Sequence, residues 1–196
     1  MRRKNKGFTL VELVIVISIF AILLGMLAPS LNSILGFRVQ RATNSIAAAL
    51  DKTRVEAMNR LVGEMKLEKR SDGYYISYYL DRGKASRSEG AKEEQPEKIA
   101  PAGMVISYTT DTNPEEQKLG VNESVILTYD RATGGFLPLQ DVAWEQEDII
   151  STLEAGNDIP LRRTGSYCLE IKIQGGMRTR IIEMDINTGK YTIKAG

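Results

Sequence analysis

The sequence predicts an α+β protein in which one long N-terminal helix packs on a C-terminal antiparallel β domain. Three observations indicate this fold. Residues 8–28 form a continuous apolar run, residues 29–62 repeat apolar side chains every three or four positions, and residues 63–196 alternate apolar and polar side chains between glycine-containing turns. A chain of 196 residues that is 42% hydrophobic is long enough for one globular domain with one appendage.

A short basic leader, residues 1–7, precedes the apolar run. It contains Arg2, Arg3, Lys4 and Lys6 and no acidic residue. Removing these four from the 26 basic residues of the chain leaves 22 against 25 acidic ones, a balance of −3. Because a slightly acidic body does not attract polyanions, nucleic acid is not expected as a partner.

Residues 8–28 are long enough to cross a bilayer as a helix, because a hydrocarbon core of about 30 Å needs roughly 20 residues. The basic leader, followed by no charge except Glu12 before Arg38, places the N-terminus in the cytoplasm and the C-terminal domain outside. Two ordinary alternatives are a cleaved secretory signal and an uncleaved signal anchor. Met26-Leu27-Ala28 fits a secretory cleavage site poorly, whereas the hydropathy alone fits an anchor.

Glu12 argues against both alternatives. A carboxylate inside an apolar span is costly and usually has a partner, and the span contains no lysine or arginine. Cleavage between Gly7 and Phe8 would create an α-amino group, which is mostly cationic at neutral pH because its pKa is about 8. A neighbouring subunit, shifted along the helix axis, can offer that amine to Glu12. The unpaired carboxylate therefore predicts a chain that assembles after cleavage.

The run Gly7-Phe8-Thr9-Leu10-Val11-Glu12, placed between a basic leader and an apolar helix, resembles the class III signal of type IV prepilins and type II secretion pseudopilins. The resemblance implies cleavage after Gly7 by a membrane peptidase that also methylates Phe8, and a subunit-docking role for Glu12. It implies as partners this prepilin peptidase/methylase, other pilins or pseudopilins, an inner-membrane assembly platform with its ATPase, and membrane lipid. The implied location is the cytoplasmic membrane, as a single-pass protein, and then a cell-surface or periplasmic fibre.

Pro29 follows the apolar run. It has no N–H, and its ring crowds the carbonyl of Gly25, so the sequence predicts a kink or local melting between these two residues. The alternative is that Pro29 only marks the end of the span. The amphipathic stripe beyond it ends in residues 47–60, which resemble the end of the helix in H-type minor pseudopilins and FimT-like minor pilins, with Thr53 where alanine is usual.

A period of two begins at Glu64 and indicates β structure. Residues 64–68 and 74–80 form a predicted hairpin around Ser71-Asp72-Gly73. Further strands are expected at 104–109, 123–129, 166–173, 179–186 and 190–194, in one sheet or two. Two segments break the pattern: 81–98 is highly charged and predicts a long mobile loop, and 140–158 predicts a loop with a short helix. Trp144 in the second segment is a packing residue or a subunit contact.

The sequence offers no convincing catalytic, metal or cofactor site. Histidine is absent, which excludes histidine-dependent nucleophilic catalysis and imidazole metal ligation. The single cysteine, Cys168, lies in a predicted strand, so it forms no intramolecular disulfide and is interpreted as a small buried side chain. Residues 111–116 carry oxygen ligands, but their spacing favours a solvated turn over a calcium loop.

Two charged groups are interpreted as surface features. Acidic residues between 141 and 148 form a predicted solvated helix face. Arg162 and Arg163, together with Arg178 and Arg180, form at most a small basic patch without interleaved aromatic residues. The chain is therefore predicted to be a structural subunit and not an enzyme: a pilin or pseudopilin, of the minor kind. The alternative is a binding module at the fibre tip for DNA uptake, adhesion or secreted cargo.

Overall fold

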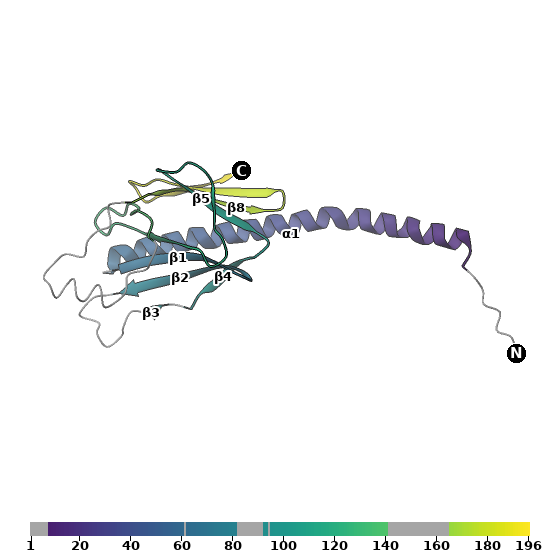
Figure 1. Ribbon diagram of the computed structural model, residues 1–196, viewed down its shortest axis with the longest axis horizontal. Coiled ribbons are helices and arrows are strands. Elements are labelled where there is room, and N and C mark those ends of the chain that lie inside the picture. Colours follow the sequence, from purple (N-terminus) through teal and green to yellow (C-terminus); the bar gives the residue numbers. More distant parts are fainter. Residues whose placement is uncertain (1–7, 61, 82–91, 94, 141–164) are drawn as a thin grey trace.

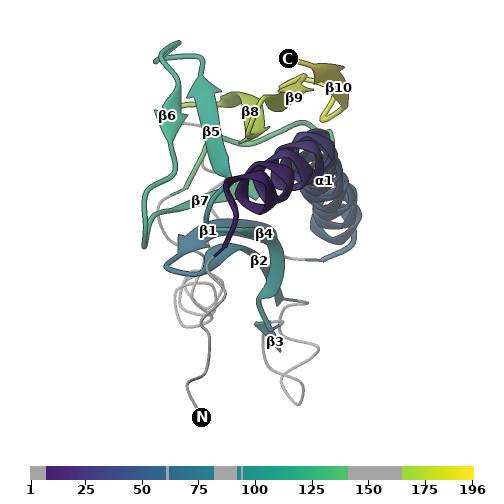
Figure 2. The same ribbon diagram turned by 90° about the vertical axis from the view of Figure 1, so that its right-hand side faces the viewer.

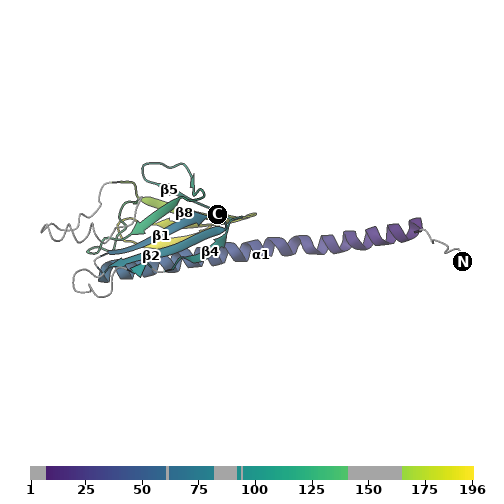
Figure 3. The same cartoon turned by 60° about the horizontal axis from the view of Figure 1, so that its bottom comes forward.

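The computed structural model describes residues 8–60, 62–81, 92–93, 95–140 and 165–196, and within them the side chains of 26–33, 81 and 92–93 are left out. Over these residues the protein consists of one long helix, α1, and two antiparallel sheets. The N-terminal half of α1 extends away from the body, and its C-terminal half packs on the sheets (Figures 1 and 3). The predicted α+β class, with an N-terminal helix packed on antiparallel sheets, is confirmed.

Helix α1 runs from Leu10 to Asn59, a length of 50 residues or about 75 Å. It is continuous through Gly25 and Pro29, so the local melting expected there is not observed, while a kink stays a prediction. The helix ends because Arg60 adopts an extended conformation, with its N–H donating to the carbonyl of Glu56. Strand β1 therefore begins at once, and the chain reverses direction within a few residues.

The first sheet has five strands. β1 (Val62–Arg70) and β2 (Gly73–Asp81) form the predicted hairpin, with Met65 opposite Tyr78 and Leu67 opposite Ile76. β7 (Ser124–Thr128) pairs with the other side of β1, so that β1 lies inside the sheet. β3 (Lys92–Glu93) and β4 (Glu97–Pro101) both pair with the outer edge of β2.

The second sheet also has five strands, in the order β10-β9-β8-β5-β6. They are β5 (Val105–Thr110), β6 (Gln117–Lys118), β8 (Cys168–Gly175), β9 (Arg178–Met184) and β10 (Tyr191–Ala195). All pairs are antiparallel, and β8 and β9 are joined by a tight turn at Gly176 and Met177.

The core lies where α1 meets both sheets, since the helix contacts β1 and β4 of the first sheet and β8 and β9 of the second (Figure 2). Val39, Ile46 and Leu50 supply the buried stripe of the helix, as the spacing predicts. Thr53 is also fully buried, and its hydroxyl donates to the Ala49 carbonyl at 2.7 Å. The threonine that replaces the usual alanine is thus satisfied within its own helix.

The predicted strands outside the charged segments are confirmed, with ends shifted by one or two residues. The prediction of one loop over 81–98 is wrong in part, because β3 and the first residues of β4 lie in it. β4 forms because the edge of β2 needs a partner and because Ile99 and Ala100 are buried against the core. The predicted helix within 140–158 and Trp144 lie in 141–164, outside the described residues.

Candidate functional site at the start of the long helix

The first turn of α1 is closed by Thr9 and Glu12. Thr9 is the N-cap, and its hydroxyl accepts a hydrogen bond from the Glu12 N–H at 3.2 Å. In return, the Glu12 carboxylate accepts the Thr9 N–H and the Thr9 hydroxyl, each at 2.9 Å. This reciprocal arrangement is a capping box, which satisfies helix N–H groups that otherwise have no partner. The helix therefore begins at Leu10, within the predicted signal, and Glu12 lies in its first turn.

The apolar span contains no lysine or arginine to pair with Glu12, but the structure shows that this carboxylate has neutral hydrogen-bond partners. Thr9 supplies neutral hydrogen-bond donors, and the spacing Thr-x-x-Glu before an apolar run is a signal that could have revealed them. Both donated hydrogen bonds reach Oε2 of Glu12. No cation lies within ion-pairing distance of this carboxylate among the described residues.

The described apolar side chains between Leu10 and Leu24 are exposed on every side of the helix. The exposed fraction of the side chain is 79% for Leu10, 59% for Phe20 and 63% for Leu24. The globular body therefore covers none of this segment. Exposed apolar surface of this extent marks an interaction site. Within the described residues, no helix meets the combined length and hydropathy criteria for a membrane span. Gly7, like the rest of the leader 1–7, lies outside the described residues, whereas Phe8 is described and exposed.

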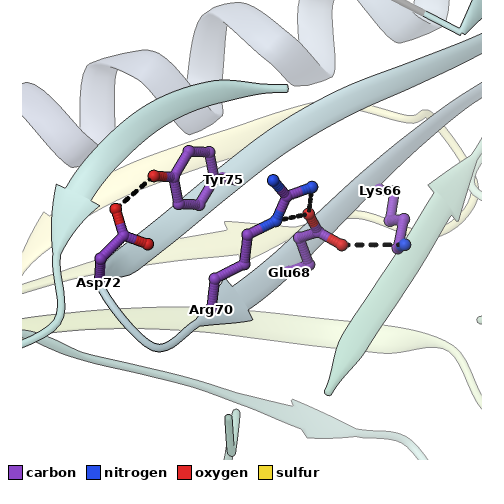
Figure 4. Close-up of polar contacts among 5 residues, drawn as sticks. All are labelled: Lys66, Glu68, Arg70, Asp72 and Tyr75. Atoms are coloured by element: carbon purple, nitrogen blue, oxygen red, sulfur yellow. Dashed lines mark hydrogen bonds and ion pairs between the residues drawn. The ribbon is translucent and has the colours of Figure 1, made fainter. Parts of the chain in front are cut away.

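A cluster of polar contacts lies on the β1–β2 hairpin (Figure 4). Lys66 at 2.9 Å and Arg70 both pair with Glu68. Partial burial acts to raise the pKa of Glu68, but hydrogen bonds from the two cations outweigh it and lower the pKa. Asp72 accepts hydrogen bonds from Lys98 at 2.7 Å and Tyr75 at 2.6 Å, in that order the main causes of its lowered pKa. These are ion pairs at the surface, and the carboxylates are held ionised rather than poised for proton transfer.

The oxygen-rich segment 111–116 is a turn whose oxygens already have partners. Asp111 accepts the Tyr167 N–H at 2.7 Å, and Asn113 accepts the Glu115 N–H at 3.0 Å. Glu116 pairs with Lys172 at 2.8 Å, which, with a hydrogen bond from Ser107, lowers the pKa of Glu116. In the part of the chain that the structure describes, no group of three or more cysteine and acidic side chains is placed to hold a metal ion.

Cys168 is buried, with 2% of its surface exposed, as predicted from its place in a strand. Burial raises the pKa of the thiol to about 12, so it stays protonated and unreactive at neutral pH. Arg178 and Arg180 lie on β9, but their predicted companions Arg162 and Arg163 are outside the described residues, as are the acidic residues of 141–148.

Residues 2–28 match the family model of the prokaryotic N-terminal methylation motif. The matched range contains Gly7, Phe8 and Glu12, the residues on which the resemblance to prepilins was based. No curated protein and no solved structure matches the chain. The match confirms the predicted resemblance of the N-terminal segment to type IV prepilins.

Proposed function

We propose that the protein is a structural subunit of a type IV pilus or a type II secretion-like pseudopilus. It is inserted in the cytoplasmic membrane through the first half of α1, with its N-terminus in the cytoplasm. The prepilin peptidase cleaves it after Gly7 and methylates Phe8, and an assembly platform with its ATPase then moves it into a helical fibre. The observation that carries the proposal is the methylation motif at residues 2–28, which includes the first turns of an uncovered apolar helix.

The length and shape of α1 support this role. Residues 13–37 carry no charge and span roughly 38 Å as a helix. The described side chains of this segment from Leu13 to Leu24 must be covered by lipid or by other apolar helices, because the globular body does not cover them. In a fibre, the helices of neighbouring subunits would provide that cover. A head-to-tail contact of this kind does not close on itself, so it produces an open filament.

Cleavage after Gly7 would change the charges at the start of α1. The new α-amino group of Phe8 is adjacent to Thr9, which donates to the Glu12 carboxylate in the uncleaved chain. The proposal is that the amine of one subunit pairs with Glu12 of the next, so that the leader prevents assembly until it is removed. Subunits that are cleaved then have both partners of the ion pair.

The first test is the N-terminal sequence and mass of the mature protein. The expected start is a methylated Phe8, and replacing Gly7 by isoleucine should leave the full-length chain in the membrane. A mature protein that begins at Met1 or after Ala28 would overturn the proposed processing. This measurement is independent of assembly, so it tests the leader by itself.

The second test separates the charge of Glu12 from its capping role. Glu12→Ala removes both, whereas Glu12→Gln removes the charge and keeps a side chain that closes a capping box. Thr9→Val is the converse variant, since it removes the cap hydroxyl and leaves the carboxylate. We expect all three chains to be cleaved, both Glu12 variants to be missing from sheared fibres, and Thr9→Val to be present. Normal incorporation of Glu12→Gln would contradict the amine–carboxylate pairing.

The proposal places the chain among the minor subunits, because the end of its helix resembles those of H-type pseudopilins and FimT-like pilins. A minor subunit is scarce in the sheared surface fraction, whereas a major subunit dominates it. Quantifying the chain against the most abundant fibre protein decides between the two. A chain that dominates the fraction would reject the minor assignment and leave the subunit role intact.

A further inference from the structure

The turn between β8 and β9 lies at the end of the globular body that faces the uncovered half of α1 (Figures 1 and 3). Close packing on the helix holds it there. A Cβ on Gly175 would lie 2.7 Å from Val39 Cγ2, and one on Gly176, whose φ is +60°, would lie 2.8 Å from Leu35 Cδ1. The turn therefore follows the helix surface, and Met177 at its tip is 87% exposed.

Exposed apolar and basic side chains surround α1 at this level. We call them the collar: Ile34, Phe37, Arg38 and Arg41 on α1, with Met177 and Arg178 on the turn. Phe37 is 71% exposed and Ile34 48%. Arg178 reaches back to the helix, since a Cβ on Gly36 would lie 3.4 Å from Arg178 Cγ. Apolar side chains are thus exposed beside cations within about two turns of the helix, roughly 10 Å along its axis.

The side-chain charge of the collar is positive. α1 has no acidic residue between Glu12 and Asp51, and residues 174–180 contain none. No ion pair joins Arg38, Arg41 or Arg178 to any described residue. The three arginines therefore present their charge to the surroundings.

The collar consists of two groups of side chains, one on the side of the helix that faces away from the body and one on the body side. Val39 and Ala42 face the body and are buried, so the helical repeat turns Ile34, Phe37, Arg38 and Arg41 away from it. Met177 and Arg178 lie on the body side. A protein docked on one face would cover only one of these groups. A flat surface perpendicular to the helix axis would contact both.

The height of the collar fits the surface of a bilayer crossed by α1. Charges are absent from residue 13 to residue 37, a length of roughly 38 Å, while the hydrocarbon core is about 30 Å thick and the whole bilayer about 40–45 Å. With Glu12 at the inner boundary, the collar reaches the outer headgroup layer. Basic side chains beside apolar ones at a helix end are the combination that binds anionic lipid headgroups.

We propose that, before assembly, the collar binds anionic phospholipid headgroups on the outer face of the cytoplasmic membrane. This inference rests on the proposed function, because it requires α1 to be inserted. Met177 and Phe37 would enter the headgroup layer while the three arginines bind phosphates. The collar would then hold the body upright on the membrane at a fixed depth, with the rest of the body, on β1, β2 and β5–β7, turned toward other subunits. Each arginine is expected to strengthen headgroup contact roughly five-fold.

The test uses the full-length chain in phosphatidylcholine vesicles with or without phosphatidylglycerol. A fluorophore is attached to a new cysteine at Met177, and quenching by a headgroup-labelled lipid is measured. Buried Cys168 should not react, which the unmodified parent chain verifies. Asn187→Cys is the matched control, because its turn is fixed at the far end of the body by a 2.9 Å hydrogen bond from Arg54 to Thr188. Ile19→Cys with an acyl-chain quencher reports insertion of α1.

We expect strong quenching at Met177→Cys in the mixed vesicles and none at Asn187→Cys. The ratio of molecules whose β8–β9 turn is bound to the headgroup layer to molecules in which it is free should fall about 25-fold when Arg38→Gln and Arg178→Gln are combined. If Ile19→Cys is not quenched, the proposed membrane insertion fails. If Ile19→Cys is quenched while Met177→Cys is no more quenched than Asn187→Cys, only the collar inference fails. Equal quenching at Met177→Cys with and without phosphatidylglycerol would also overturn it.

Discussion

The joint between α1 and the first sheet depends on the absence of a side chain at Gly63. This residue is buried at the start of β1, and a Cβ built on it would lie 2.5 Å from the backbone nitrogen of Ala57 and 2.8 Å from the carbonyl carbon of Glu56. Both atoms belong to the last turns of α1. The strand cannot move away alone, because the Gly63 carbonyl accepts the Thr128 hydroxyl at 2.7 Å and Gly63 pairs with Leu80. Gly63→Ala must therefore displace the helix end or break the start of the sheet.

Overpacking a core costs about 1–3 kcal/mol, and a clash with the backbone of α1, which cannot rotate away as a side chain can, belongs at about 3 kcal/mol. For a chain of this size, each kcal/mol lowers Tm by about 2–4 °C, so Gly63→Ala should lower Tm by roughly 6–12 °C. Gly103→Ala is the matched control, because a Cβ there meets nothing within 4 Å. Thermal unfolding of both variants in detergent, followed by circular dichroism, measures the difference. A Gly63→Ala chain that melts within about 2 °C of Gly103→Ala would refute the steric account.

Three further predictions concern the body. Burial raises the pKa of Cys168 from 9.0 to about 12, so the protonated thiol stabilises the fold below pH 9 and this contribution is lost as the pH rises toward 12. Between these pH values, Cys168 lowers the free energy of unfolding by about 1.4 kcal/mol per pH unit. This decrease should be absent when the unfolding of Cys168→Ala is measured over the same pH range. Ile46→Ala should cost about 2–5 kcal/mol in denaturant unfolding, because Ile46 is fully buried between α1 and the sheets. Lys98→Ala should raise the pKa of Asp72 measured by NMR titration, since the hydrogen bond from Lys98 is the first cause of its lowered value, and leave Tm almost unchanged because the pair is exposed.

Strong periodicity made most of the fold predictable from the sequence. Residues 64–68 and 74–80 alternate around Ser71-Asp72-Gly73, and this pattern alone identifies the β1–β2 hairpin. β4 could not be recognised in the same way. It begins with two charged residues and ends at Pro101, so only Ile99 and Ala100 mark it as a buried strand. Its existence follows from the free edge of β2, which is a property of the sheet and not of the five residues themselves.

The collar could not be predicted from the sequence. Charge alone groups Arg178 with Arg162 in a small basic patch. The structure places Arg178 beside Gly36, in a helix more than a hundred residues earlier in the chain. Sequence periodicity predicts which face of a helix is buried, but it does not predict which turn of a sheet stops at which level along that helix. That information depends on the packing of Gly175 and Gly176 against Leu35 and Val39.

The capping box changes the argument about Glu12 without removing it. From the sequence alone, the carboxylate is expected to require assembly because the apolar span contains no lysine or arginine that can pair with it. In the structure Thr9 donates to it twice, so Glu12 is fixed in position and partly solvated by its own chain. Neutral donors spread a negative charge but do not cancel it, and the electrostatic cost of an apolar environment depends on the net charge. A cation from another subunit therefore still offsets a cost that Thr9 cannot. Because the cap holds the carboxylate in place before the cation arrives, pairing requires less ordering of the Glu12 side chain. The same interaction that helps to start the helix thus prepares its docking site.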